Sequence, residues 1–274
     1  MASGKTHGMG ECVVVFAWNG KDNPFQHIEW NTVPQFKVCL FNYFGNNAVP
    51  ELLPNTNFDI LINTRTEFKG SLINEVYKHF KASPAIDYIG FIDDDLAISI
   101  SGINQLFEIA YQANLDAFQP ATTPQSYMSH AFTLQKPNLI WESTDWVEIM
   151  CPFYRKNIFD AASEFYPNCI SSYGIDRYAI PYFQKLLGSD KTAVIHAVPV
   201  THLKPITNGN MSFSNGLSAI EEGELIRKAL LKRIKNENAH LFSKAFLKNV
   251  FEYRTFRWEK WRWDLKRLIG YKSK

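Results

Sequence analysis

The first ninety-two residues alternate between short apolar runs and one segment in which apolar positions repeat at helical spacing. The apolar runs cover residues 11–18, 36–44, 58–63 and 87–92. Such runs, rich in β-branched and aromatic residues, predict buried strands, and the first two are closed by turn signals at Asn19-Gly20 and Gly45-Asn46. Between the last two runs, Leu72, Val76 and Phe80 predict a helix over 71–80. Repeated strand–helix units indicate an α/β fold with a mostly parallel sheet and helices on both faces.

The pattern weakens after residue 116. Residues 117–143 are rich in Pro, Thr, Ser and Gln, which predicts loops with short strands. Beyond them we expect strands over 146–154 and 192–200, a helix over 175–187 that breaks or starts near Pro181, and helical character from 218 to 271. The expected units are an N-terminal tail or cloning remnant over 1–10, an α/β catalytic domain over 11–216 and a helical extension over 217–274.

Composition and cysteine use narrow the class of protein. The chain has 274 residues, of which 46% are hydrophobic and 20% charged, values that exclude a disordered or collagen-like chain. No apolar run approaches the roughly 18 residues of a membrane span. The first ten residues lack the basic and apolar segments of a secretory signal. The four cysteines lie far apart, which predicts buried, reduced thiols, no zinc site and a cytoplasmic location.

Charge is distributed unevenly along the chain. Residues 227–274 hold 15 Lys and Arg against 4 Asp and Glu, although the whole chain has a net charge of only +2. Within 244–271 the cations alternate with aromatic residues, including Phe246, Phe251 and three tryptophans. This mixture favours an anionic membrane surface on the cytoplasmic face, with a helix packed on the domain a close second. The acidic body argues against nucleic acid as the partner.

Three consecutive acids, Asp93, Asp94 and Asp95, follow the apolar strand predicted at 87–92. Ligands of open α/β sheets bind beyond the carboxyl ends of strands. Three adjacent carboxylates repel one another, and a divalent cation such as Mg²⁺ or Mn²⁺ would remove that cost while holding a diphosphate. The alternative is a solvated acidic turn. The fully apolar strand before it favours metal binding.

The segment Phe-Ile-Asp-Asp-Asp-Leu resembles the DxD motif of GT-A glycosyltransferases, which use nucleotide-sugar donors. Downstream, Asp-Trp-Val-Glu-Ile-Met-Cys-Pro at 145–152, Tyr-Gly-Ile-Asp at 173–176 and Val-Thr-His at 200–202 follow in order. The series is similar to that of a largely uncharacterised family of plant and bacterial proteins with a GT-A-like fold. The resemblance covers residues 69–202. Tyr173 replaces a tryptophan of that family and Cys151 a small residue, and neither change removes a ligand or base.

The resemblance implies roles for the residues at the acidic motif. Asp95 is the expected direct metal ligand. Asp93 would face the ribose or base and is a second candidate for the metal, while the role of Asp94 stays open. A late histidine often reaches the metal or phosphates in GT-A enzymes. His202 matches the family's position, and His196 is its competitor.

Two further acids are candidates for acid–base work. Asp176 resembles the general base that follows Trp-Gly in GT-A families, but an aspartate before a helix is also a common N-cap. Glu148 lies in the apolar run at 146–150, where a buried carboxylate needs a partner. It would bind acceptor hydroxyls, act as the base itself, or pair with Arg155 or Arg177.

Position alone suggests the remaining contacts to the nucleotide. Lys69 begins the predicted helix and matches a lysine of the family, so it would contact phosphate, although an exposed lysine is the simpler interpretation. Trp18 and Asn19 end the first strand, where a base would stack or form hydrogen bonds. Asp59 and Asn63 flank the third strand similarly.

The sequence therefore predicts a metal-dependent glycosyltransferase with a nucleotide-sugar donor and a glycan or lipid-linked acceptor, active in cell-surface polysaccharide synthesis. With Asp176 as the base, direct displacement with inversion is the simplest mechanism. One alternative is a metal-dependent phosphoryl or nucleotidyl transferase or hydrolase that uses the same acids. The other is a non-catalytic protein that binds sugar nucleotides or glycans.

Overall fold

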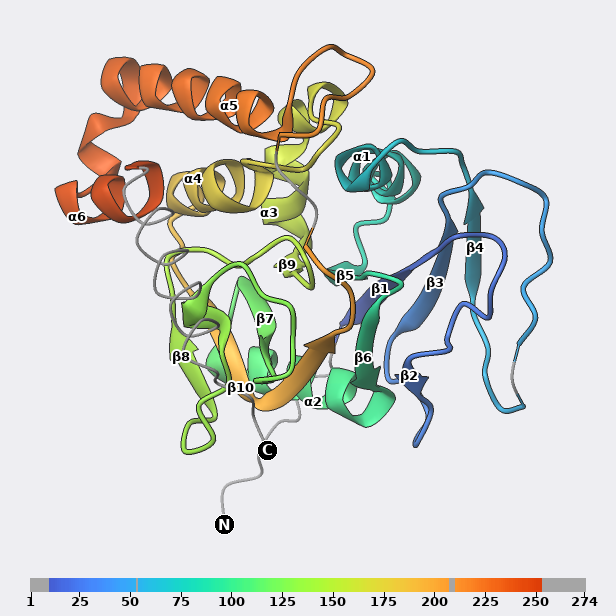
Figure 1. The fold of residues 1–274 in the computed structure, drawn as a ribbon. Coiled ribbons are helices and arrows are strands. Elements are labelled where there is room, and N and C mark those ends of the chain that lie inside the picture. Colours follow the sequence, from blue (N-terminus) through green and yellow to red (C-terminus); the bar gives the residue numbers. More distant parts are fainter. Residues whose placement is uncertain (1–9, 53, 207–209, 253–274) are drawn as a thin grey trace, which may run out of the picture.

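The computed structural model describes residues 10–52, 54–206 and 210–252. At its centre is a mixed, mostly parallel β-sheet with helices on both faces, as Figure 1 shows. Its first half is fully parallel and consists of β1 (Glu11–Trp18), β3 (Lys37–Asn42), β4 (Ile60–Asn63) and β5 (Ile86–Ile92). These strands match the four predicted runs. The predicted fold class is confirmed.

The second half of the sheet mixes strand directions. A short strand, β9 (Phe153–Arg155), runs antiparallel between β5 and β7 (Ala117–Thr122), and β7 pairs in parallel with β10 (Thr192–His202). The remaining strands are β2 (Ile28–Glu29), β6 (Leu96–Ser99) and β8 (Trp141–Ser143). The full order is β2-β6-β10-β7-β9-β5-β1-β3-β4, with β8 beside β10. Strand β10 is the predicted strand at 192–200, extended by two residues to His202.

Alternation along the strands gives the sheet two buried faces. In β1, Val13 and Val15 point to the face covered by α1, whereas Val14 and Phe16 point to the face covered by α2. Figure 1 shows α1, α3, α4 and α5 on one side and α2 on the other. The helices are α1 (Lys69–Phe80), α2 (Ile100–Ala113), α3 (Lys156–Ala161), α4 (Ile180–Leu186), α5 (Ala219–Arg233) and α6 (Lys244–Phe246), with short 3₁₀ turns at Ala131–Thr133, Ala162–Asn168 and Ala239–Leu241 and π-helical turns at Ile175–Ala179, Ile234–Asn238 and Leu247–Phe251.

The strand predicted over 146–154 is wrong for most of its length. Only Phe153–Arg155 joins the sheet, and the preceding residues form an irregular loop. The backbone N–H groups of Glu148 and Ile149 donate to the side chains of Gln119 and Asp176 rather than to a neighbouring strand. An apolar run thus becomes a loop because side chains from elsewhere satisfy its backbone.

The segment after β10 packs back on the domain. A capping box between Ser218 and Glu221 starts α5. Ile226, Leu230 and Phe251 belong to the same hydrophobic core as β1 and α1, and so does Phe246. For residues up to 251 the packed-helix interpretation of the basic segment therefore holds, while 253–271 lie outside the described residues. Within the described ranges, no helix has the length and apolar character needed to cross a bilayer.

Candidate functional site

A cavity of about 500 Å³ opens at the carboxyl end of β5. Asp93, Asp94 and Asp95 form one wall of it. The start of α1, the loop at 146–150, the turn at 171–178 and the first turns of α5 close the other sides. Its volume lies within the range of about 300–1,000 Å³ that is typical of small-molecule sites. The cavity thus lies beyond the end of the strand that the sequence predicted to carry the site.

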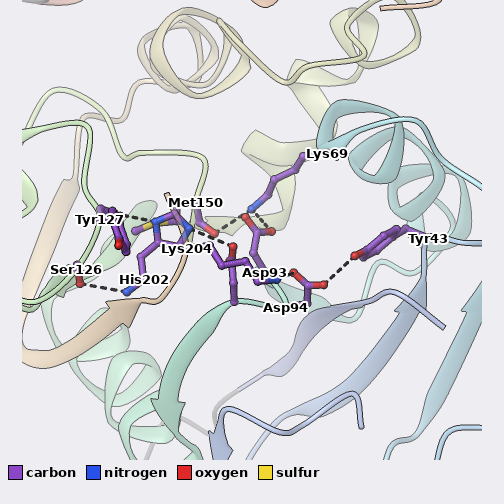
Figure 2. A network of polar contacts seen from close by, with 10 residues as sticks. Tyr43, Lys69, Asp93, Asp94, Ser126, Tyr127, Met150, His202 and Lys204 are labelled. Carbon is purple, nitrogen blue, oxygen red and sulfur yellow. Dashed lines mark hydrogen bonds and ion pairs between the residues drawn. The ribbon is translucent and has the colours of Figure 1, made fainter. Parts of the chain in front are cut away.

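Each carboxylate of the acidic motif has a partner of its own, and these partners are labelled in Figure 2 together with Asp93 and Asp94. The contacts are Asp93 to the Lys69 ammonium at 2.6 Å, Asp94 to the Tyr43 hydroxyl at 2.7 Å and the Lys204 ammonium at 3.8 Å, and Asp95 to His202 Nε2 at 3.3 Å. Burial raises the pKa of Asp93, and Lys69 opposes that effect. Burial also acts to raise the pKa of Asp95, but His202 and the nearby lysines outweigh it and lower that pKa. This wall is therefore charge-balanced.

Lys69 is the first residue of α1, where the sequence predicted a helix to begin. Its ammonium donates to Asp93 and, at 2.9 Å, to the carbonyl of Met150, and its side chain is only 11% exposed. The next residue, Gly70, lies so close to the neighbouring turn that an added Cβ would be 2.1 Å from the carbonyl oxygen of Cys169. The close approach that only glycine permits there holds Lys69 at the cavity wall.

His202 ends β10, and its ring is fixed from both sides. Its Nδ1 lies 2.7 Å from the carbonyl oxygen of Tyr127, so Nδ1 carries a proton and Nε2 faces Asp95. A carbonyl behind one ring nitrogen is the arrangement that commonly orients metal-binding histidines. His196, the competing candidate, lies elsewhere, with Nε2 3.6 Å from Glu142 of β8.

Asp95 and His202 fit a divalent cation that is shared with a ligand. Among the described residues, no group of three or more His, Cys, Asp and Glu side chains is arranged to hold a metal. Mg²⁺ at nucleotide sites usually takes one or two protein ligands and completes its shell with phosphate oxygens and water, which is what this pair leaves room for. Asp93, the second predicted metal ligand, contacts Lys69 instead.

Glu148 and Asp176 line the opposite wall. Each is 8% exposed, and in the described part of the chain neither forms an ion pair. The Asp176 carboxylate accepts hydrogen bonds from the N–H groups of Ile149, at 3.1 Å, and Arg177, at 2.7 Å. Burial raises the pKa of Asp176 to about 6, with the Glu148 charge adding to the shift and the two N–H donors and His130 opposing it. Asp176 is thus a buried carboxylate that titrates close to neutral pH.

The predicted arginine partners of Glu148 are engaged elsewhere. Arg155 pairs with Asp116 at 2.8 Å, and Arg177 donates to the carbonyl of Val250 while its guanidinium lies over the Trp146 ring. One carboxylate oxygen of Glu148 is buried without a hydrogen-bond partner. Of the three alternatives for Glu148, pairing with Arg155 or Arg177 is therefore wrong, because both arginines bind other groups.

The N-cap interpretation of Asp176 is also wrong. The π-helical turn Ile175–Ala179 is preceded by Gly174 as its N-cap, and Asp176 is its second residue. Gly174 has a φ of +88°, and Ser172 has a φ of +75°, in the left-handed region that only glycine adopts readily. A strained turn therefore leads directly into the residue that resembles a general base.

Glu222 of α5 holds that turn and was not predicted from the sequence. It is 1% exposed, and it accepts hydrogen bonds from the N–H groups of Ile170 and Ser171, at 3.0 and 2.8 Å, and from the Asn215 amide. Burial disfavours its charge, but these bonds prevail and lower the pKa of Glu222. The local sequence marks its exposed neighbour Glu221 as part of the capping box with Ser218, whereas no local signal points to a role for Glu222.

Three predicted nucleotide contacts lie outside the lining of the cavity. The Trp18 indole is 2% exposed and donates to the carbonyl of Asp22. The Asn19 amide donates to the Asp22 carboxylate, and Asn63 accepts from Asn42. Asp59, flanking β4, accepts a hydrogen bond from the backbone N–H of Val38 in β3 and so stabilises the edge of the sheet. As nucleotide contacts, Trp18, Asn19 and Asn63 remain predictions.

Lining residues without a predicted role include Tyr43, His130, Trp146 and Tyr173. Tyr43 directly follows the carboxyl end of β3, so the rule that located the acidic motif also points to it. Trp146 and Tyr173 belong to the motifs at 145–152 and 173–176, whereas no local signal points to His130.

No protein-family model and no curated protein matches this sequence. Among solved structures, S. aureus TarS 1–349 in complex with UDP-GlcNAc is similar at a TM-score of 0.51 and 12% identity, over 95% of this chain and 81% of that one. The complex of the same TarS fragment with UDP also has a TM-score of 0.51 and 12% identity, over 92% of this chain and 78% of that one. A longer TarS structure gives 0.50 at 12% identity, with 91% of this chain and 45% of TarS covered. The fold is therefore GT-A-like.

Proposed function

We propose that this protein is a glycosyltransferase that uses a divalent cation to bind a nucleotide-sugar donor. The observation that carries the proposal is the pairing of two unlike walls in one cavity: a charge-balanced acidic wall and, opposite it, a buried carboxylate with a pKa of about 6. Similarity to a structure that holds UDP-GlcNAc supports the donor class. The family of plant and bacterial proteins suggested by the motifs remains part of the proposal.

On the donor side, Asp95 and His202 would hold the cation, and Lys69 would contact the diphosphate. The cation supplies Lewis-acid stabilisation of the charge that develops on the leaving diphosphate. Lys69 is held rigidly by Asp93 and the Met150 carbonyl, so it is oriented before the ligand arrives. Mn²⁺ and Mg²⁺ are the expected ions, because carboxylate and imidazole donors suit both.

On the acceptor side, Asp176 would take the proton of the acceptor hydroxyl. The hydroxyl oxygen then forms a bond to the anomeric carbon, the bond from that carbon to the phosphate oxygen breaks, and the nucleoside diphosphate leaves with the electron pair. Attack from the side opposite the leaving group inverts the configuration. A base with a pKa of about 6 is ionised at neutral pH and still basic enough to assist.

The acceptor is proposed to be a glycan or a lipid-linked sugar, with polysaccharide synthesis as the process served. The location at the cytoplasmic face of a membrane rests on the basic, aromatic sequence of 253–271 together with the lysines at 244 and 248. Phe246 and Phe251 take no part in membrane contact, because both are buried in the core.

The first test is thermal stability against a panel of nucleoside diphosphates and nucleotide sugars, with and without Mn²⁺. A ligand of the native state raises Tm by mass action. We expect a shift that needs both the cation and Asp95, which Asp95→Ala abolishes and Asp190→Ala, at an exposed ion pair, leaves unchanged. Full sugar transfer by Asp95→Ala would sink the proposal.

The same assay separates the alternatives. Release of phosphate or pyrophosphate without sugar transfer would indicate a phosphoryl or nucleotidyl transferase or hydrolase. Metal-dependent binding without turnover, retained in Asp176→Asn, would indicate a binding protein.

A further inference from the structure

We infer that the wall opposite the acidic motif is a subsite for an uncharged or ammonium-bearing sugar and that it rejects phosphate- and carboxylate-bearing acceptors. The acceptor wall is defined here as Glu148, Asp176 and the rings of Trp146 and Tyr173, all of which line the cavity. This inference rests on the proposed function and narrows its acceptor class.

Glu148 supplies the first argument. Its side chain lines the cavity, yet it is 8% exposed and one of its oxygens has no hydrogen-bond partner. A buried carboxylate oxygen without a donor costs free energy, so such an atom marks a place where a ligand donor belongs. A sugar hydroxyl or ammonium provides that donor. A phosphate or carboxylate oxygen provides none and adds repulsion.

Asp176 supplies the second argument for this inference. It lies on the same wall, and its negative charge acts on that of Glu148. Its two hydrogen bonds come from backbone N–H groups, which carry no net charge. His130 offsets part of the Asp176 charge, but among the described residues neither carboxylate of the wall forms an ion pair, so a like charge docked against them is disfavoured.

The cations of the cavity are engaged on other groups. Lys69 is held by Asp93, Lys204 lies by Asp94, and the Arg177 guanidinium donates to the Val250 carbonyl and lies over Trp146. Seven carboxylates line the cavity, against one lysine, one arginine and two histidines, His130 and His202, with Lys204 just outside the lining. A divalent cation and a diphosphate at Asp95 would balance each other there and leave the acceptor wall negative.

The rings of Trp146 and Tyr173 complete the subsite. Ligand pockets combine apolar and aromatic surfaces with a few polar groups that fix orientation, and a sugar ring offers a matching apolar face and hydroxyl edge. Hydroxyl donors to Glu148 and a ring face against an aromatic side chain can be satisfied by the same sugar.

The experiment uses the full chain and ligand-observed NMR with three matched β-1,4 disaccharides, built from glucose, glucosamine or glucuronate. We expect the glucose and glucosamine forms to bind and the glucuronate form to bind at least about tenfold more weakly, as repulsion from charged groups implies. Glu148→Gln should weaken the glucosamine form by about tenfold or more, the worth of a hydrogen bond to a charged group. Glu108→Gln, an equal charge change on an exposed residue of α2, is the matched control.

Donor binding is measured separately by the UDP-dependent thermal shift of the wild type. Equal or tighter binding of the glucuronate form would overturn the inference while the donor shift upholds the proposed function. An effect of Glu108→Gln equal to that of Glu148→Gln would also overturn it, since net charge rather than the acceptor wall would then decide. Loss of the donor shift alone would count against the proposed function and not against the sugar subsite.

Discussion

The two walls of the cavity use the same side-chain chemistry in opposite electrostatic settings. At the end of β5, Asp93, Asp94 and Asp95 each meet a lysine, a hydroxyl or a histidine. Across the cavity, the hydrogen bonds to Asp176 come from backbone N–H groups and one oxygen of Glu148 has no hydrogen-bond partner, while His130 acts on Asp176 electrostatically. Partners of this kind hold the carboxylates in a fixed geometry, which suits ligand binding. Carboxylates without such partners are left reactive, which suits proton transfer.

Removing the reactive group should have the largest effect. We expect Asp176→Asn to lower kcat by about 10²–10⁴, the usual contribution of a general base. The UDP-dependent thermal shift should persist, because the donor wall, defined as Asp93, Asp94 and Asp95 with Lys69 and His202, is untouched. Initial-rate kinetics with saturating donor measures the loss, and a loss below about tenfold would indicate that another group is the base.

The same variant tests whether Asp176 is strained. Its pKa of about 6 in the fold lies above the ordinary 3.8, so its contribution to stability is fully present below pH 3.8 and is lost as pH rises through 6. Asp176→Asn removes this charge and should raise the free energy of unfolding at pH 8 by up to about 3 kcal/mol. Its Tm at pH 8 should therefore equal or exceed that of the wild type. A lower Tm at pH 8 would contradict a strained carboxylate.

Unbalancing the donor wall should have the next largest effect. Lys69→Met keeps the length of the side chain but removes the cation beside Asp93. We expect the affinity for nucleoside diphosphates to fall about tenfold to a hundredfold, the worth of one charge-assisted hydrogen bond. Lys78→Met, on the exposed part of α1, serves as the control and should bind normally. Unchanged affinity in Lys69→Met would show that this lysine serves the fold alone.

The pH dependence of the transfer rate and of nucleotide binding distinguishes the roles of the two walls in the wild-type protein. The rate with saturating donor should fall tenfold per pH unit below about 6, as Asp176 becomes protonated. Nucleotide binding, followed by the thermal shift over the same range, reports on the other wall. A flat rate profile between pH 5 and 8 would rule out Asp176 as the base.

The smallest effect is expected at the support of the acceptor wall. Glu222→Gln removes a charged acceptor from the backbone of Ile170 and Ser171 and should cost about 1–3 kcal/mol of stability, seen as a lower Tm. It should also lower kcat, because the turn before Asp176 loosens. Glu221→Gln weakens only the cap of α5 and should leave kcat unchanged. Equal kcat values in the two variants would limit Glu222 to a structural role.

Local patterns predicted the donor wall well. The apolar run of β5, the acids after it and Lys69 at the start of α1 are neighbours in sequence, so strand and helix signals suffice to place them. Helix α2 carries equally clear signals, namely Ile103, Phe107 and Ala110 at helical spacing after the cap Ser99, but lies in a stretch for which no element was predicted.

The acceptor wall was less predictable because its geometry comes from distant residues. The loop that carries Glu148 avoids the sheet through the side chains of Gln119 and Asp176. Glu222 reaches its turn from about fifty residues away. Single-sequence periodicity contains no information about such pairings, so motif resemblance was the guide to Asp176, and the guide to Glu148 was its place as a carboxylate in an apolar run.

The contact of α5 with the turn at 171–174 has a consequence for how the molecule opens. Because Glu222 and the apolar face of α5 join this turn to the core, local fraying of the helix would disturb the acceptor wall as well. Amide hydrogens of Ile226 and Leu230 should therefore exchange only through near-global unfolding, at rates close to those of β1. Helix α5 and the turn that supports the acceptor wall then unfold as one cooperative unit. A substitution in the buried face of α5 should therefore alter activity and stability together.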